Sequence, residues 1–282
     1  MVKNKITTPA NAKINLHLQV LNRLPNGYHN ISTIFQSVTL SDTVTLEVLE
    51  GSGVTVFTEN AVIDGENLAQ KAADLFLNKA GITAKINITL NKNIPIAAGL
   101  AGGSADAAAV LKGLNELFNN PLSENDLLTL GLNLGADVPF CIKGGTALAE
   151  GVGEKLTPLP FIGEYTVVLI KSFNKSSTGN MYSRLDSRDE IPPCLTNDIL
   201  KHLKSGNTAD AFKLCTNDFL SVSDNVNEQK AIISRLYDCG AVFAGLSGSG
   251  PTVFGLFKNL DEKVAQTLKN EYGNIYICKT TE

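Results

Sequence analysis

The segment Pro95–Ala108, with the sequence PIAAGLAGGSADAA, constrains the fold of this chain more than any other. It follows a strand-like run and leads directly into a helical pattern over residues 104–118. Gly99, Gly102 and Gly103 allow backbone angles that other residues avoid, and the surrounding alanines remove side-chain bulk. A helix that begins here directs unpaired N–H groups and the positive end of its dipole toward the loop. The segment therefore predicts a phosphate-binding strand–loop–helix unit.

Two better-known glycine motifs do not fit this segment. No Lys-Ser or Lys-Thr follows the last glycine, so it is not a Walker loop, and the spacing is not that of the GxGxxG dinucleotide fingerprint. The remaining alternative is a tight strand–helix turn that serves packing alone.

The pattern elsewhere mixes strands and helices without strict alternation, which favours an α+β fold. A period of two predicts strands at Lys13–Val20, Val44–Glu50, Val54–Glu59 and Ala84–Leu90, and apolar runs predict others at Tyr165–Lys171, Ala241–Ala244, Thr252–Phe257 and Ile275–Lys279. Helical spacing predicts helices at Glu66–Ala80, Ser104–Phe118, Asn197–Lys204, Thr208–Leu214, Asn225–Cys239 and Leu260–Tyr272. Gly81 is a predicted helix stop, Ser123 with Asp126 predicts a capping box for a helix toward Leu134, and Asn174–Pro193 reads as irregular with a short helical stretch.

The stretch Gly151–Gly163 is polar and rich in proline and glycine, so we place a domain boundary there. The expected domains are residues 1–155 and 156–282.

Composition excludes several classes of function. The net charge of −4 offers no basic excess for nucleic acid, and no run of 18 uncharged apolar residues predicts a membrane span. The five cysteines show no CxxC spacing and the three histidines form no HExxH motif, so we expect reduced thiols, no protein metal site and a cytoplasmic protein. The N-terminus lacks the apolar core of a signal peptide.

The glycine segment resembles the phosphate loop of the GHMP kinases, in the form carried by the 4-diphosphocytidyl-2-C-methyl-D-erythritol kinase family. ANAKINL at 10–16, NGYH at 26–29, LGADVPF at 134–140 and GLSGSGP at 245–251 are similar to further motifs of this family and occur in the expected order. The family usually has proline where Asn11 stands, a difference that removes no chemical group. The resemblance implies that ATP phosphates are bound by Pro95, Ile96, Ala97, Ala98, Gly99, Leu100, Ala101, Gly102, Gly103, Ser104 and Ala105.

Lys13 and Asp137 stand in two of these motifs. A kinase that acts on an alcohol needs a group to orient the hydroxyl and accept its proton, and a cation near it. The resemblance implies that Asp137 is the general base and Lys13 its partner. Without the motifs, Lys13 would be a surface strand lysine and Asp137 a turn residue ahead of Pro139, which favours an extended backbone before it.

The resemblance also implies residues that bind the substrate. In the family, the tyrosine and histidine that match Tyr28 and His29 contact a cytidine by stacking and by a hydrogen bond to the base. Substrate contacts are expected at Asn15, Tyr28, His29, Gly248, Ser249 and Gly250. The alternatives are a solvated loop at 27–29 and a floppy hairpin turn at 245–251.

As a member of this family, the chain would phosphorylate the 2-hydroxyl of a cytidine-diphosphate-bearing methylerythritol with ATP. We expect Mg²⁺ to arrive with ATP, with Ser104 as the one plausible protein contact. The family implies an N-terminal lobe like ribosomal protein S5, a ferredoxin-like C-terminal lobe, and a monomer or homodimer. A GHMP kinase for another small alcohol and a non-catalytic nucleotide-binding homologue remain as alternatives.

Overall fold

The computed structural model describes residues 4–60, 66–171, 176–188 and 191–282. Its contacts divide the chain into two interleaved units. Unit 1 consists of Met1–Ala12, Ser41–Ile96 and Ala101–Lys143, and unit 2 consists of Lys13–Leu40, Ala97–Leu100 and Gly144–Glu282. Because each unit uses separated pieces of chain, the expected division into residues 1–155 and 156–282 stays a prediction.

Two long strands contribute to both units. They are β1 (Lys5–Arg23) and β2 (His29–Leu49), and they pair with each other. Both are longer than the sequence pattern predicted. The first part of β2 is buried at nearly every position, so it has no alternation that could mark a strand.

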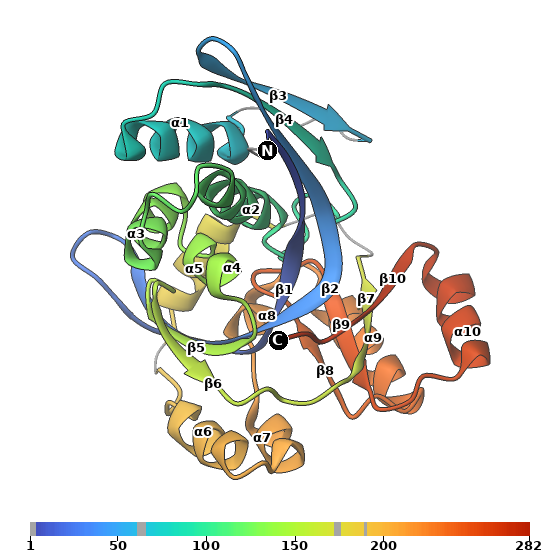
Figure 1. The fold of residues 1–282 in the computed structure, drawn as a ribbon. Coiled ribbons are helices and arrows are strands. Elements are labelled where there is room, and N and C mark those ends of the chain that lie inside the picture. Colours follow the sequence, from blue (N-terminus) through green and yellow to red (C-terminus); the bar gives the residue numbers. More distant parts are fainter. Residues whose placement is uncertain (1–3, 61–65, 172–175, 189–190) are drawn as a thin grey trace. The chain divides into compact units, whose positions relative to one another are not determined.

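Unit 1 contains a small sheet and a group of helices that lie beside it. Its further elements are β3 (Gly53–Glu59), α1 (Leu68–Ala80), β4 (Lys85–Asn91), α2 (Gly102–Leu117), α3 (Glu124–Leu134) and α4 (Val138–Lys143). β4 pairs in parallel with β3 and antiparallel with the second half of β2. Helix α2 packs against α1, α3 and α4, and these helices gather beside the strands of the unit (Figure 1).

Local signals set the ends of the unit 1 helices. Gly81 closes α1 in the left-handed conformation, and Ser123 and Asp126 form the predicted capping box of α3. The expectation of an extended backbone before Pro139 is wrong, because α4 begins at Val138. Proline is tolerated in the first turn of a helix, where its missing N–H has no partner to lose.

Unit 2 contains a β-hairpin and a separate four-stranded sheet. The first half of β2 pairs with β5 (Thr146–Gly151), which pairs with β6 (Lys155–Leu159). The second sheet has the order β10-β7-β9-β8 and is antiparallel throughout, with β7 (Thr166–Ile170), β8 (Phe243–Leu246), β9 (Val253–Phe257) and β10 (Ile275–Lys279). β6 falls in the stretch that its proline and glycine content had suggested to be a domain boundary.

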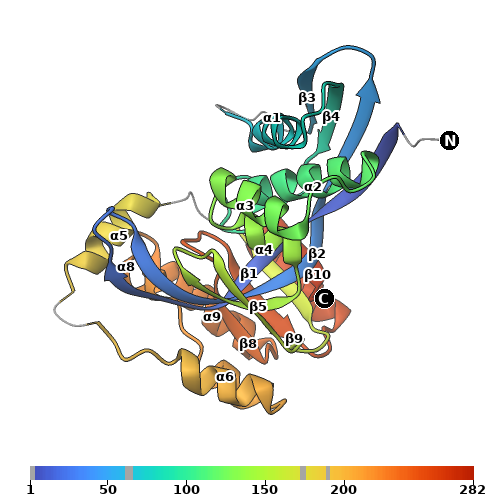
Figure 2. The ribbon, with the colours of Figure 1, turned by 60° about the vertical axis from the view of Figure 1, so that its left-hand side comes forward.

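The helices of unit 2 are α5 (Thr178–Asp186), α6 (Thr196–Lys204), α7 (Thr208–Leu214), α8 (Asp218–Val222), α9 (Val226–Asp238) and α10 (Glu262–Tyr272). α9 packs against β8 and β9, and the three are seen together in Figure 2. Ile232 and Leu236 of α9 join Val168, Val253 and Leu268 in one buried apolar cluster. The strands β7, β8, β9 and β10, with α9 before β8 and α10 before β10, give the βαββαβ order of a ferredoxin-like sheet.

The irregular segment expected at residues 174–193 is described only in part, because residues 174–175 and 189–190 lie outside the described residues. Its short helical stretch is α5. Within the described part of the chain, every helix is too short or too polar to cross a bilayer.

Candidate active site

The predicted glycine loop, residues 95–101, connects β4 to α2. Ala97, Gly99 and Ala101 have positive φ angles of 52°, 77° and 60°. Helix α2 begins at Gly102, two residues earlier than predicted, and its N-cap Ala101 makes no side-chain hydrogen bond. The N–H groups of the first turn of α2 are therefore not satisfied by a capping side chain, as a phosphate-binding helix start requires.

Gly99, Gly102 and Gly103 of the predicted segment have different conformations and surroundings. Of these three, only Gly99 uses the left-handed region that glycine permits, and Gly102 and Gly103 lie in the first turn of α2. A Cβ atom at Gly102 would lie 3.2 Å from Cγ2 of Ile94, so glycine there allows close packing.

Gly99 lies against the second glycine turn, residues 245–251. A Cβ atom at Gly99 would lie 2.3 Å from the carbonyl oxygen of Ser247 and 2.9 Å from that of Gly250. The Ser247 hydroxyl donates a hydrogen bond of 2.9 Å to the Gly99 carbonyl. Any side chain at residue 99 would force these two backbone segments apart, so the approach itself requires glycine.

Lys13 and Asn15 are buried beside the Gly99 carbonyl. The Lys13 amine donates to Asn15 Oδ1 at 2.7 Å and to the Gly99 carbonyl at 3.3 Å, and it lies 5.0 Å from the centre of the Phe35 ring. Gly248 is close as well, since a Cβ atom there would be 3.6 Å from Asn15 Oδ1. The structure thus brings together four predicted site residues: Lys13, Asn15, Gly99 and Gly248. It also shows that Lys13 is not the surface lysine of the alternative interpretation, because only 3% of it is exposed.

The second glycine turn is held by Asn217. The Asn217 amide donates to the carbonyl oxygens of Leu246 at 2.7 Å and of Gly248 at 2.9 Å, while its Oδ1 accepts the N–H of Phe219. Ser249 shares a hydrogen bond of 2.9 Å with Thr178. The turn is therefore fixed by side chains rather than floppy. Neither Asn217 nor Thr178 had a role predicted from the sequence.

Asp137 lies in the turn between α3 and α4 and is half-buried. Its carbonyl oxygen accepts the N–H of Cys141 at 3.1 Å in the first turn of α4. Because Asp137 belongs to unit 1 and Lys13 to unit 2, their pairing stays a prediction.

A buried ionic group of unit 1, the Lys92 cluster, joins the segments of chain that precede and follow the glycine loop. The Lys92 amine contacts Asp42 and lies 2.5 Å from Asp106 Oδ2. Asp42 Oδ1 accepts the N–H groups of Asn93 and Ile94 at 2.6 and 2.7 Å, which fixes the backbone just before the loop. Asp106 belongs to the second turn of α2, so the cluster ties both ends of the loop to one cation.

The carboxyl group of Asp106 has a shifted pKa. Burial raises the pKa of its carboxyl to about 7, against the opposing effect of Lys92. Its Oδ1 has no hydrogen-bond partner among the described residues. This cluster was not predicted from the sequence. The available signal was a carboxylate in an otherwise small and apolar helical run, because a buried charge requires a partner.

Tyr28 and His29 line a separate cavity in unit 2, of about 340 Å³, which we call the Tyr28 pocket. The His29 ring stacks on Tyr182 with 4.5 Å between ring centres, and its Nε2 lies 2.6 Å from Asp186 Oδ1. Tyr28 is 65% exposed, so its ring is available to a ligand. A flat heterocycle suits such a site, because stacking on aromatic rings contributes about 1–3 kcal/mol per base. Tyr182 and Asp186 had no predicted role.

No group of three or more histidine, cysteine, aspartate or glutamate side chains is arranged to hold a metal ion within the described ranges. Ser104, the expected contact for a nucleotide-bound cation, lies in the first turn of α2.

Comparison with known proteins identifies the class of protein to which the chain belongs. A family model described as the GHMP kinases N terminal domain matches residues 67–145, and one described as GHMP kinases C terminal matches residues 200–274. L. major mevalonate kinase, solved in complex with R-mevalonate, shares the fold, with a TM-score of 0.75 at 18% identity over 99% of this chain and 98% of that one. The chain is therefore a GHMP kinase in fold, with two α+β lobes as expected.

The family within this class follows from closer relatives. Proteins named 4-diphosphocytidyl-2-C-methyl-D-erythritol kinase are 37% identical in Clostridium acetobutylicum, over 96% of this chain and 98% of the relative, and 41% identical in Caldicellulosiruptor saccharolyticus, over 97% and 96%. A crystal structure of 4-(cytidine 5'-diphospho)-2C-methyl-D-erythritol kinase matches with a TM-score of 0.82 at 32% identity, over 98% of this chain and all of that one. The chain belongs to the 4-diphosphocytidyl-2-C-methyl-D-erythritol kinase family.

Proposed function

We propose that this protein transfers the γ-phosphoryl group of ATP to the 2-hydroxyl of 4-diphosphocytidyl-2-C-methyl-D-erythritol, a step of non-mevalonate isoprenoid precursor biosynthesis. The observation that carries the choice of substrate is the Tyr28 pocket, where an exposed tyrosine adjoins a stacked histidine and tyrosine. A cytidine base fits that chemistry, whereas mevalonate, homoserine and galactose have no aromatic base to stack. Full-length similarity to relatives of that name supports the same conclusion.

Each part of the site has an assigned role in this proposal. The backbone of residues 95–105, which spans the glycine loop and the first turn of α2, holds the ATP phosphates. Asp137 orients the acceptor hydroxyl and takes its proton late, and Lys13 is the cation that balances the charge of Asp137. Asn15 and Gly248–Gly250 contact the acceptor. Phosphoryl transfer depends mainly on positioning and charge stabilisation, so these roles require no covalent intermediate.

Mg²⁺ accompanies ATP in this proposal and neutralises phosphate charge. The described residues offer an oxygen at Ser104 rather than a cluster of carboxylates, which suits an ion that keeps several waters and binds phosphate oxygens. We further propose a cytoplasmic enzyme, active as a monomer or homodimer on a small molecule and not on nucleic acid, with the lobes divided near residue 155.

An ADP-release assay tests the proposed substrate. Purified protein is supplied with ATP, Mg²⁺ and one acceptor at a time: the cytidylylated methylerythritol, mevalonate, homoserine, galactose or none. We expect ADP release above the blank with the cytidylylated acceptor alone. Release with another acceptor would assign a different small-molecule kinase, and ATP binding without release on any acceptor would identify a non-catalytic homologue.

Asp137→Asn tests the general base. The amide keeps the shape of the side chain but cannot accept the proton, so we expect kcat to fall at least 100-fold while ATP still binds. Asp74→Asn is the matched control, since Asp74 is an exposed carboxylate on α1 outside the site. An unchanged kcat in Asp137→Asn removes Asp137 from the mechanism.

A further inference from the structure

A second cavity of unit 2, the Phe212 pocket, lies at the end of the four-stranded sheet opposite to the glycine turn. Tyr165 precedes β7, Val242 precedes β8 and Lys258 follows β9. The strand registers pair Thr166 with Phe257 and Phe243 with Leu256, so these three strand termini lie at the same end of the sheet. The turn 245–251 joins β8 to β9 at the other end, roughly 13–17 Å away along a five-residue strand. The pocket is therefore distinct from the Gly99–Lys13 region.

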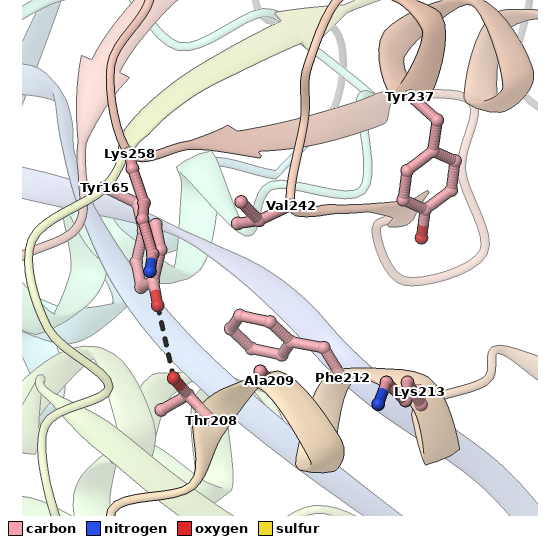
Figure 3. Close-up of a pocket in the computed structure, with 8 residues that line it drawn as sticks. All are labelled: Tyr165, Thr208, Ala209, Phe212, Lys213, Tyr237, Val242 and Lys258. Carbon is pink, nitrogen blue, oxygen red and sulfur yellow. Dashed lines mark hydrogen bonds between the residues drawn. The ribbon is translucent and has the colours of Figure 1, made fainter.

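The pocket has the size and the lining of a small-molecule site. Its volume is about 370 Å³, and helix α7 closes it with Thr208, Ala209, Phe212 and Lys213 (Figure 3). Small-molecule sites typically occupy about 300–1,000 Å³, with apolar walls and a few convergent polar groups.

The apolar wall is built from aromatic rings that pack on one another. The Phe212 ring packs edge-on against Tyr165 at 5.8 Å and stacks on Phe243 at 5.0 Å. Aromatic pairs of this kind stabilise the position of each ring beyond simple burial. Figure 3 shows Phe212 and Val242 facing each other, with Tyr165 and Lys258 on one side and Tyr237 on the other.

Two large apolar side chains of the lining are exposed to solvent. Tyr237 is 45% exposed and Val242 39% exposed. An apolar ligand body would remove this surface from water, which favours its binding.

The charges at the rim favour an anion. Lys213 is paired with Asp210 at 2.7 Å, so its charge is balanced within α7. Lys258 has no ion pair among the residues that the structure describes. The register places it next to Tyr165, whose hydroxyl shares a hydrogen bond of 3.3 Å with Thr208. One unbalanced ammonium and two hydroxyl groups thus meet at one side of an apolar cavity.

We propose that the Phe212 pocket binds a small amphipathic anion, with an aromatic or branched apolar body and one carboxylate, sulfonate or phosphate group. The apolar body lies against Phe212 and Val242, and the anionic group lies at Lys258 and the Tyr165–Thr208 pair. This inference does not depend on the proposed kinase function, and its test measures binding alone.

The probe is 8-anilinonaphthalene-1-sulfonate, an aromatic anion whose fluorescence rises in apolar sites, titrated into the full chain. Lys258→Met removes the cation and keeps the aliphatic stem, so we expect Kd to rise at least 5-fold. Lys263→Met is the matched control, because Lys263 is an exposed lysine of α10 outside the pocket, and the Kd of this variant should stay within 2-fold of wild type.

Ala209→Phe fills the cavity from an exposed position of α7 and should raise Kd at least 10-fold. The uncharged analogue N-phenyl-1-naphthylamine should bind more weakly than the sulfonate and should not distinguish Lys258→Met from wild type.

Three results would overturn the proposal: equal sulfonate binding by wild type and Ala209→Phe, equal effects of the two lysine substitutions, or displacement of the probe by cytidine diphosphate, which would place it in the Tyr28 pocket. Thermal unfolding of each variant verifies the fold. If Ala209→Phe does not fold, the comparison of Lys258→Met with Lys263→Met decides whether the proposal holds.

Discussion

Two glycine-rich segments of this protein are held in place by different kinds of polar contact, ionic for one and neutral for the other. The loop 95–101 is flanked by the Lys92 cluster, in which two buried carboxylates share one ammonium and one of them fixes the backbone at residues 93–94. The turn 245–251 is held by the neutral amide of Asn217, which donates to two of its carbonyl oxygens.

The difference matters because the ionisation of a buried carboxylate depends on pH, whereas a neutral amide does not titrate. Burial of ionised groups also costs more free energy, and this cost is offset only when every partner is present. We therefore expect the loop to depend on protonation and the turn to depend on hydrogen-bond geometry. At Gly99 the two segments meet, and their close approach leaves no room for a side chain at that residue.

The largest effect is expected for Gly99→Ala. Its Cβ atom would overlap the Ser247 carbonyl oxygen at 2.3 Å and displace the loop from the turn, so we expect kcat/KM to fall at least 1,000-fold. Gly206→Ala is the matched control: Gly206 has the same φ of 77°, but no neighbour within 4 Å of a Cβ atom. It should show only backbone strain, about 1 kcal/mol in the free energy of unfolding, with unchanged kinetics. Similar kinetics for both variants would show that the close approach is dispensable.

An intermediate effect is expected for Asn217→Asp. The carboxylate can still accept the Phe219 N–H and cap α8, but it cannot donate to the Leu246 and Gly248 carbonyl oxygens. We expect kcat/KM to fall roughly 10–100-fold, as expected for a loss of about 1.4–2.7 kcal/mol of transition-state stabilisation. The measurement is steady-state kinetics together with the far-UV circular dichroism of the folded variant. Wild-type kinetics would show that the amide serves α8 alone.

The smallest effect is expected in the pH dependence of stability through Asp106. Because burial raises the pKa of Asp106 to about 7 in the folded protein, the folded state binds more protons than the unfolded state between about pH 4 and 7. The stability from this group is complete below the unfolded pKa and is lost as the pH rises through 7, by at most about 1.4 kcal/mol per pH unit.

Asp106→Asn removes this titration, so the Tm of wild type should fall relative to the Tm of the variant between pH 5 and 8. Asp74→Asn, which changes an exposed carboxylate of the same unit, should keep the wild-type slope. Parallel Tm curves for wild type and Asp106→Asn would mean that Asp106 stays ionised throughout this range and that the contrast between the two segments does not hold.

The fold was predictable where a pattern is local and long enough to repeat. Thr208–Leu214 and Ile275–Lys279 have the predicted bounds, and the capping box at Ser123 is confirmed. The short helices α4 and α8 were missed because five or six residues do not establish a period. The hairpin strand β6 was missed because proline and glycine dominate its surroundings.

The sequence by itself determined local features: the glycine loop, the helix that follows it and the left-handed helix stop at Gly81. These were predictable because φ preferences and helix capping depend on residues that are neighbours in the chain. Only the tertiary structure decided which buried polar groups meet. Asp42 lies 50 residues before Lys92, and Lys13 lies 86 residues before the Gly99 carbonyl that it contacts. Such pairs form because a polar group removed from water must find a partner within hydrogen-bond distance, and the folded backbone, not the sequence spacing, sets which partner is in reach.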